Sequence, residues 1–231
     1  MIASFAAVTG LRWSTGNRKL AKTGDLLGTQ VWSFNLPAFR SDDGFRVCPG
    51  SGACSTVCYA QQGWYNRDVV AGLREENLRI LREAPDMVVL LRDLVAALPD
   101  GVGAIRLHDS GDFFSAAYLD AWLAAIRGNP ARTFYAYTKS VPLVTRVVIP
   151  TNLSVVYSEG GRFDRLIPVG APRSRIFADH RSREAAGWSD GNGIEADLPA
   201  IRGDKRVGLV YHGGPRDVGV LDQVPLFSEG P

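Results

Sequence analysis

The stretch AIRLHDSGDFF, residues 104–114, decides the fold. Its first part, residues 104–108, is short and mostly apolar and predicts a buried β-strand. The polar loop Asp109-Ser110-Gly111-Asp112 follows it directly, and residues 118–127 then place apolar side chains at helical spacing. A strand, a polar loop and a helix in this order form one unit of an α/β fold.

The same order repeats along the chain. Strand patterns run into polar segments again at residues 138–140 and 158–161. The helical spacing of residues 66–98 is divided by Pro85, which predicts two helices there. The predicted strands are residues 29–39, 104–108, 133–137, 153–157, 166–169, 175–178 and 207–211.

Alternating strands and helices predict an α/β domain in which parallel strand–helix repeats form a partial or complete TIM-like barrel. A closed eight-stranded barrel typically takes about 250 residues, so a partial barrel is favoured. The strand ends that precede helices share one face of such a sheet. We therefore expect the polar segments, including Lys139 and Glu159, to surround one mouth.

The composition is that of a globular protein, with 45% hydrophobic and 22% charged residues. It excludes a mostly disordered or fibrous protein. A net charge of +2 does not indicate a strong field for nucleic acid over the whole molecule, although a local basic patch remains compatible with it.

The chain is expected to hold one α/β domain, residues 29–212, with an N-terminal extension over residues 1–28 and a loosely ordered tail over residues 213–231. Its apolar runs are far shorter than the roughly 20 residues that span a bilayer. Residues 1–8 lack the basic start and cleavage site of a secretory signal. We therefore expect a cytoplasmic protein with no membrane partner.

All the cysteines lie in one glycine-containing loop, CPGSGACSTVCYA, residues 48–60. The loop holds three cysteines, Cys48, Cys54 and Cys58. An odd number of closely spaced cysteines is typical of metal ligands and unsuited to a disulfide framework. Soft thiolates at this spacing suit zinc or an iron–sulfur cluster. The alternative, three small buried hydrophobic residues, fits a Pro-Gly-Ser-Gly segment less well.

The identity of the metal depends on a fourth ligand, because structural zinc is almost always four-coordinate. The histidines of the chain, His108, His180 and His212, are the candidates, and none has zinc-finger spacing. A four-iron cluster needs only three protein thiolates when its remaining iron binds a ligand or cofactor. We therefore favour a 4Fe–4S cluster, with zinc as the alternative.

Two carboxylates stand in the loop after the strand of residues 104–108. Asp109 and Asp112 can act as general base or nucleophile, or can hold an amine or ribose hydroxyl. The structural alternative is that Asp112 or Ser115 caps the next helix. Because capping needs one such residue and several are present, we assign Asp109 and Asp112 as candidate catalytic residues.

Charged residues also follow the next two predicted strands. Lys139 can pair with a phosphate or carboxylate and Glu159 can accept from a base or an amine, unless both are simply solvated. The basic stretch of residues 17–22 is assigned to the surface. The chain has no Walker sequence, no dinucleotide-binding glycine motif and no Gly-x-Ser-x-Gly elbow, which disfavours the enzymes built on these motifs.

Several of these motifs together resemble the gene product 88 family of bacteriophage and prophage proteins. The resemblance runs over about residues 13–180 and implies a phage or prophage origin, hence a host cytoplasm, without implying an activity. The motifs that carry it are WSFNLPA (residues 32–38), the cysteine loop, HDSGDF (108–113), YAYTKS (135–140) and YSEGG (157–161).

The order of parts is also similar, more distantly, to radical S-adenosylmethionine enzymes. That resemblance implies that Cys48, Cys54 and Cys58 hold a 4Fe–4S cluster whose free iron binds S-adenosylmethionine. It also implies that Ser110-Gly111-Asp112 is the motif that contacts the cofactor. From their positions after the strands, Lys139 and Glu159 are expected to line the same mouth and to take part in cofactor binding. Five and then three residues separate the cysteines here, whereas three and two are usual in that superfamily.

A competing resemblance is to the zinc-containing guanine transglycosylases, which exchange a base in RNA or DNA. Asp109-Ser110-Gly111 is similar to their aspartate-containing base-pocket segment, although the cysteines here precede that segment. A non-enzymatic nucleic-acid-binding module with a structural metal is the third interpretation. We therefore expect a metal-dependent phage enzyme, and the resemblance to phage proteins implies a nucleobase, a nucleotide or nucleic acid as its substrate or partner.

Overall fold

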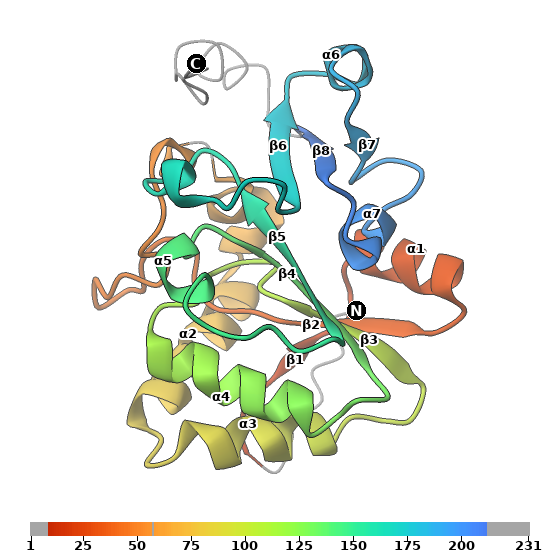
Figure 1. The fold of residues 1–231 in the computed structure, drawn as a ribbon. Coiled ribbons are helices and arrows are strands. Elements are labelled where there is room, and N and C mark those ends of the chain that lie inside the picture. Colours follow the sequence, from red (N-terminus) through yellow and green to blue (C-terminus); the bar gives the residue numbers. More distant parts are fainter. Residues whose placement is uncertain (1–8, 57, 212–231) are drawn as a thin grey trace.

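Eight strands form one sheet in the computed structural model, which describes residues 9–56 and 58–211 (Figure 1). The strands are β1 (Trp13–Ser14), β2 (Gln30–Phe34), β3 (Val102–Leu107), β4 (Thr133–Thr138), β5 (Leu153–Ser158), β6 (Arg173–Phe177), β7 (Ser189–Asp190) and β8 (Arg206–Val210). The α-helices are α1 (Arg18–Leu27), α2 (Asp68–Glu83), α3 (Met87–Ala96), α4 (Ala116–Arg127), α5 (Val141–Val144), α6 (His180–Ala185) and α7 (Leu198–Arg202). Short 3-10 helices are η1 (Ala53–Ser55), η2 (Tyr59–Gln61), η3 (Gly63–Asn66) and η4 (Asp164–Leu166).

The sheet is mostly parallel and open. Its strand order is β1-β2-β3-β4-β5-β6-β8-β7, and only the β1–β2 pair is antiparallel. The α/β class with a mostly parallel sheet is therefore confirmed, and the complete TIM-like barrel is wrong. The edge strands β1 and β7 have two residues each, too few to provide the ladder of hydrogen bonds that closure would need.

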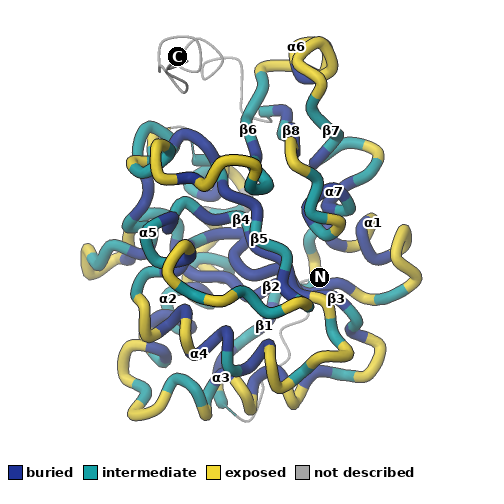
Figure 2. The backbone as a smooth tube through the Cα atoms, in the orientation of Figure 1, coloured by how far each residue is buried: buried dark blue, intermediate teal, exposed yellow. Residues whose placement is uncertain are grey.

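One face of the sheet carries the large apolar core. Along β3 and β4 this face receives alternate residues, such as Ile105, Leu107 and Phe134, because successive strand side chains point to opposite faces. Helices α3 and α4 pack here, and Trp122 of α4 is fully buried. Figure 2 shows the resulting alternation of buried and exposed chain along both helices.

The opposite face is covered by α1 and α7, which contact β2, β4 and β5. Its apolar cluster is smaller and includes Leu20 from α1 and Ala200 from α7. The alternate residues of β3 and β4 point to this side, among them Ala104 and Tyr135. A barrel of strands alone would leave this face to interior side chains, whereas here two helices complete its cover.

The register of the central strands sets where the functional segments begin. Phe34 of β2 pairs with Leu107 of β3, and Leu107 pairs with Ala136 of β4. The segments that follow these strands therefore leave the sheet at similar heights along one edge. This arrangement gives the polar segments after β3 and β4 a common location.

Local sequence signals explain the helix boundaries. The break predicted at Pro85 separates α2 from α3, and the Asp86 side chain caps α3 by accepting from the N–H groups of Val88 and Val89. Residues 166–169 do not form the predicted strand. Leu166 instead ends η4, and Ile167 follows it with its N–H bonded to the carbonyl of Asp164.

Residues 13–27 lie within the predicted N-terminal extension of residues 1–28. They form β1 and α1, which pack against β2. The tail expected over residues 213–231 lies outside the described residues. Within residues 9–56 and 58–211, the helices are all too short or too polar to traverse a lipid bilayer.

Candidate functional site

A cavity of about 160 Å³, here called the thiol cavity, lies where the three-cysteine loop folds over the carboxyl ends of β3 and β4. It brings together every site residue predicted from the sequence except Glu159. The predicted residues that line it are Cys48, Cys54, Cys58, Asp109, Ser110, Gly111, Asp112 and Lys139. Segments that begin at separate strand ends thus share one small enclosed space.

Glycines let the three-cysteine loop lie directly on the backbone of the strand ends. A Cβ added at Gly50 would lie 1.9 Å from the carbonyl oxygen of Lys139, and one at Gly161 would lie 2.9 Å from the carbonyl oxygen of Gly50. The N–H of Cys54 donates to the carbonyl of Gly160 over 3.3 Å. Any side chain at these glycines would lift the thiols away from the strands.

All the cysteines are free thiols and partly buried. The N–H of Phe39 donates to Sγ of Cys48 over 3.3 Å, and backbone groups of Ala60 and Gln61 hydrogen-bond to Cys58. Burial nevertheless raises the pKa of Cys48 and of Cys58. Burial thus favours the neutral thiols, whereas a bound metal would favour the thiolates.

No group of three or more Cys, His, Asp or Glu side chains in the described part of the chain is arranged to hold a metal ion. The three thiols are close enough to interact electrostatically. One zinc ion in tetrahedral geometry would need thiolate sulfurs about 3.8 Å apart, given its Zn–S distance of about 2.3 Å. A cluster binds each thiolate to a different iron, so it holds its ligands farther apart.

Asp112 joins the ends of β3 and β4. Its Oδ1 accepts from the hydroxyl of Thr138 over 2.6 Å, and its Oδ2 accepts from the N–H of Lys139 over 2.9 Å. Burial raises the pKa of Asp112, and these donors oppose that rise. Asp112 does not cap α4, because the hydroxyl of Ser115 does so by accepting from the N–H of Tyr118 over 3.1 Å.

Asp109 is buried and held on several sides. Its Oδ2 accepts from the side-chain amide of Asn17 over 2.8 Å and from the hydroxyl of Tyr65 over 2.9 Å. Its Oδ1 lies 3.2 Å from the hydroxyl of Tyr59 and 3.6 Å from the guanidinium of Arg106. The carboxylate is thus fixed in position at the wall of the cavity.

A buried ionic network continues from Arg106 to the far side of the site. Asp197 is fully buried and pairs with Arg106 over 3.0 Å and with Lys19 over 2.5 Å, while Tyr135 and Tyr137 donate to it over 3.0 and 3.2 Å. Burial raises the pKa of Asp197, but the two cations prevail and hold it below its ordinary value. The surface position predicted for Lys19 is therefore wrong, because the carboxylate draws it inward.

The loop after β3 is also tied to the segment after β2. Ser110 donates its hydroxyl to the carbonyl of Leu36 over 2.7 Å, and a Cβ at Gly111, where φ is 88°, would lie 2.7 Å from Cβ of Leu36. His108 has a φ of 64°, and its Nε2 lies 2.9 Å from the hydroxyl of Tyr118. Gly111 is thus required both by conformation and by close approach.

Lys139 and Glu159 belong to different surroundings. The ammonium of Lys139 donates to the hydroxyl of Ser158 over 2.7 Å and to the carbonyl of Glu159 over 2.6 Å. The carboxylate of Glu159 instead pairs with Arg175 over 2.7 Å and with Arg173 over 3.7 Å. Of these two predicted residues, Lys139 lines the thiol cavity and Glu159 does not.

The histidines considered as zinc ligands are dispersed. His108 lines the thiol cavity, His180 begins α6 outside the cavity lining, and His212 lies outside the described residues. A fourth ligand from His180 is therefore not brought to the thiols in this fold.

Four polar residues of the site escaped the sequence analysis. Tyr59 and Tyr65 lie just beyond Cys58, so a search for hydroxyl donors next to the cysteine loop would have found them. Arg106 sits within the strand pattern, where a charged residue in an apolar run was itself a signal. Asp197 had no comparable signal, because only the packing of α7 brings it to the network.

A family model described as gene product 88 matches residues 11–230. The chain belongs to the gene product 88 family. Two curated relatives, both named Gene 88 protein, come from Mycobacterium phages L5 and D29. The gene product 88 chain is 38% identical to the first and 35% identical to the second, over 115 residues in each case.

Each alignment covers 46% of this gene product 88 chain and 47% of the relative, so the chain matches about half the length of these relatives. No solved structure matches it. These matches assign the family. They show no relation to radical S-adenosylmethionine enzymes or to guanine transglycosylases.

Proposed function

We propose that this gene product 88 chain is a metal-dependent enzyme with a 4Fe–4S cluster on Cys48, Cys54 and Cys58, S-adenosylmethionine as cofactor and a nucleobase or nucleotide as substrate. One observation carries the proposal: the three thiols line the same cavity as the polar segments that follow β3 and β4. Sites in parallel α/β folds form at this edge of the sheet.

The donor set fits a cluster. Three cysteine sulfurs that line one small cavity, with backbone hydrogen bonds to those of Cys48 and Cys58, are features that bind and tune iron–sulfur clusters. A cluster with three protein ligands keeps one iron for a cofactor, and with S-adenosylmethionine it supplies one-electron chemistry. Because each thiolate binds a different iron, the three sulfurs need not converge on one point.

The remaining residues bind and orient. Asp109 is fixed by Asn17 and Tyr65 on Oδ2, while its Oδ1 accepts one hydrogen bond at 3.2 Å and retains capacity for a donor from the cofactor or the substrate. Asp112 holds the β3 and β4 ends together at the cavity wall. Ser110 and Gly111 hold the loop after β3 against Leu36, and in this proposal that loop contacts the cofactor.

The first test is metal and sulfide analysis with a visible absorption spectrum on protein prepared without oxygen. We expect about four iron and four sulfide per chain, lost in Cys54→Ala and retained in the neighbouring control Ser55→Ala. Such a result would justify a direct assay for S-adenosylmethionine cleavage.

One zinc per chain with no visible band would overturn the cluster and favour base exchange by a zinc-containing transglycosylase. A chain with no bound metal would overturn both. Asp109→Asn then separates an enzyme from a binding module: in an enzyme it lowers turnover by about 100-fold or more while iron content and fold persist.

A further inference from the structure

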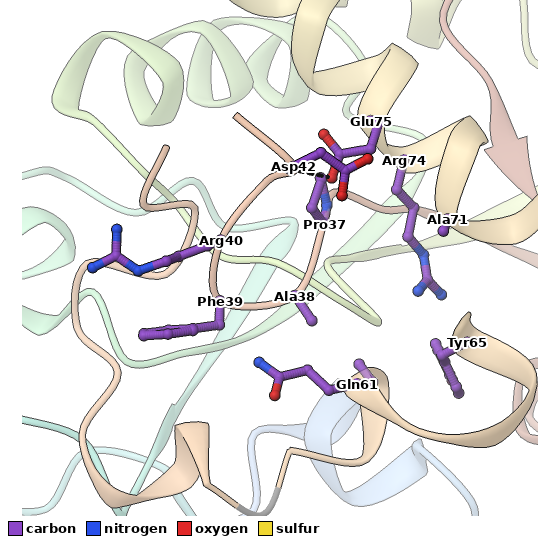
Figure 3. A pocket seen from close by; sticks show the side chains of 11 residues that line it. Pro37, Ala38, Phe39, Arg40, Asp42, Gln61, Tyr65, Ala71, Arg74 and Glu75 are labelled. Atoms are coloured by element: carbon purple, nitrogen blue, oxygen red, sulfur yellow. Dashed lines mark hydrogen bonds between the residues drawn. The ribbon is translucent and has the colours of Figure 1, made fainter. Parts of the chain in front are cut away.

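A second pocket of about 310 Å³ lies beside the thiol cavity, between the segment after β2 and the first turns of α2 (Figure 3). We call it the Arg74 pocket. Its polar lining includes Asp42, Tyr65, Arg74 and Glu75. Ala38, Phe39 and Ala60 also line the thiol cavity, so the two spaces share a wall.

Arg74 is a buried cation at the wall of this pocket. Only 6% of the residue is exposed, and its Nε has no hydrogen-bond partner. Its guanidinium lies 4.5 Å from the centroid of the Tyr65 ring, and the carboxylate of Asp109, which does not line this pocket, acts on its charge through space. Burying the Nε donor without an acceptor is costly, so a folded protein normally supplies a partner for it.

The acids of the pocket do not supply that partner. Figure 3 shows the carboxylates of Asp42 and Glu75 together at one end of the pocket, while the guanidinium of Arg74 is directed away from them toward Tyr65. Oε1 of Glu75 accepts from the N–H of Asp42 over 3.2 Å. The hydroxyl of Tyr65 is itself committed to Asp109.

We propose that the Arg74 pocket binds the oxyanion, a carboxylate or a phosphate, of a small ligand through the guanidinium of Arg74. The fork of donors on a guanidinium matches the paired oxygens of both groups. The volume is in the lower part of the range for small-molecule sites. Asp42 and Glu75 at the other end favour an anion of low charge over a polyanion.

This inference goes beyond the proposed cluster enzyme and does not depend on it, since the pocket contains none of the three cysteines. The occupant is either a separate ligand or part of a molecule that also reaches the thiol cavity. In both cases the group bound by Arg74 is an oxyanion, and the test below distinguishes a carboxylate from a phosphate.

The test is a thermal unfolding titration of the full chain with sodium acetate and with inorganic phosphate, against sodium chloride at matched ionic strength. At about ten times the dissociation constant we expect the Tm to rise by about 3–5 °C with at least one of the two oxyanions. A response to acetate alone identifies a carboxylate site, and a response to phosphate alone identifies a phosphate site.

Three variants keep the proposal falsifiable. Arg74→Met should abolish the rise, whereas Arg79→Met on the exposed side of the same helix should leave it unchanged. Ala71→Glu places a carboxylate three residues before Arg74 on α2, within reach of the guanidinium, and should raise the Tm without added anion and remove the response.

Absence of any response above that to chloride in the wild-type chain, or a response that persists in Ala71→Glu and in Arg74→Met, overturns the proposal. Cys54→Ala should respond as the wild type does. Failure of the cluster proposal would appear in the iron analysis alone, so the two failures are distinguishable.

Discussion

The two faces of the sheet differ in what they bury. On one face α3 and α4 cover an apolar core in which Trp122 packs edge-on against Phe34, with ring centroids 5.3 Å apart. On the other face α1 and α7 enclose Asp197 with its two cations, and the thiol cavity opens nearby. The first face stabilises the fold through contact area, and the second uses that stability to hold charged groups in fixed positions.

The comparison teaches where sequence change is tolerated. Apolar contacts are non-directional, so the core beneath α3 and α4 accepts other apolar side chains of similar volume with only a modest loss of stability. Buried charges need partners at defined distances, so a single replacement on the other face leaves an uncompensated group.

Among these variants, removal of the largest fully buried side chain should reduce the stability of the fold most. Trp122→Ala leaves a void between α4 and the sheet, and we expect the free energy of unfolding to fall by about 4 kcal/mol. Urea unfolding followed by circular dichroism measures it. The conservative Trp122→Phe should lose less than half as much, and equal losses would show that volume does not dominate this face.

Breaking the ionic network should come next. Asp197→Asn leaves Lys19 and Arg106 without their shared buried counter-charge, and we expect a loss of about 3 kcal/mol in the same urea experiment. Asp204→Asn, at the partly exposed pair with Arg202, is the control and should change little. A loss of stability no larger than that of the control would show that the buried charges on this face do not depend on Asp197.

The stability should depend on pH through His108. Burial lowers the pKa of His108 from 6.5 to about 3, so the unfolded chain binds a proton that the folded chain does not between these values. Stability is therefore lost as the pH falls below 6.5, by about 2 kcal/mol at pH 5. His108→Gln should flatten this part of the pH profile, and an unchanged slope would assign the titration to other groups.

The smallest effect should come from one hydroxyl. Tyr65→Phe removes the donor at 2.9 Å from Oδ2 of Asp109 but leaves Asn17 on the same oxygen, and we expect a loss of about 1 kcal/mol. If Asp109 contacts cofactor or substrate, the variant should also weaken turnover without loss of iron. Unaltered turnover would limit Tyr65 to a structural role.

The elements of the fold were largely predictable, because period-two and helical spacings record which side chains are buried. Pro85 marked the α2–α3 boundary, and the polar loop after residues 104–108 marked the end of β3. The short elements after Asp179, namely α6, β7 and α7, gave no periodic signal because each is too brief to show one. Their placement depends on contacts with β6 and β8 and with the central strands.

The sequence named the cysteines and the polar loop of the candidate site, but neither its tyrosines and Arg106 nor its geometry. The clustered cysteines and the Asp109-Ser110-Gly111-Asp112 loop stand out in the sequence because several groups able to bind a metal or act on a substrate stand close together there. Glu159 looked equivalent to Lys139 at a strand end. Only the neighbouring strand β6, which places Arg175 beside it, turned its carboxylate away from the cavity.

The sequence by itself determined the family, the α/β alternation and the chemistry available at the strand ends, because these depend on residue types and their local spacing. The tertiary structure alone decided that the sheet stays open, that Lys19 and Arg106 both pair with Asp197, and that Arg74 lines a pocket with its Nε unpaired. These features join residues far apart in the chain. The local pattern of residues does not determine the distance between two side chains that are far apart in the sequence, whereas packing against the same sheet does.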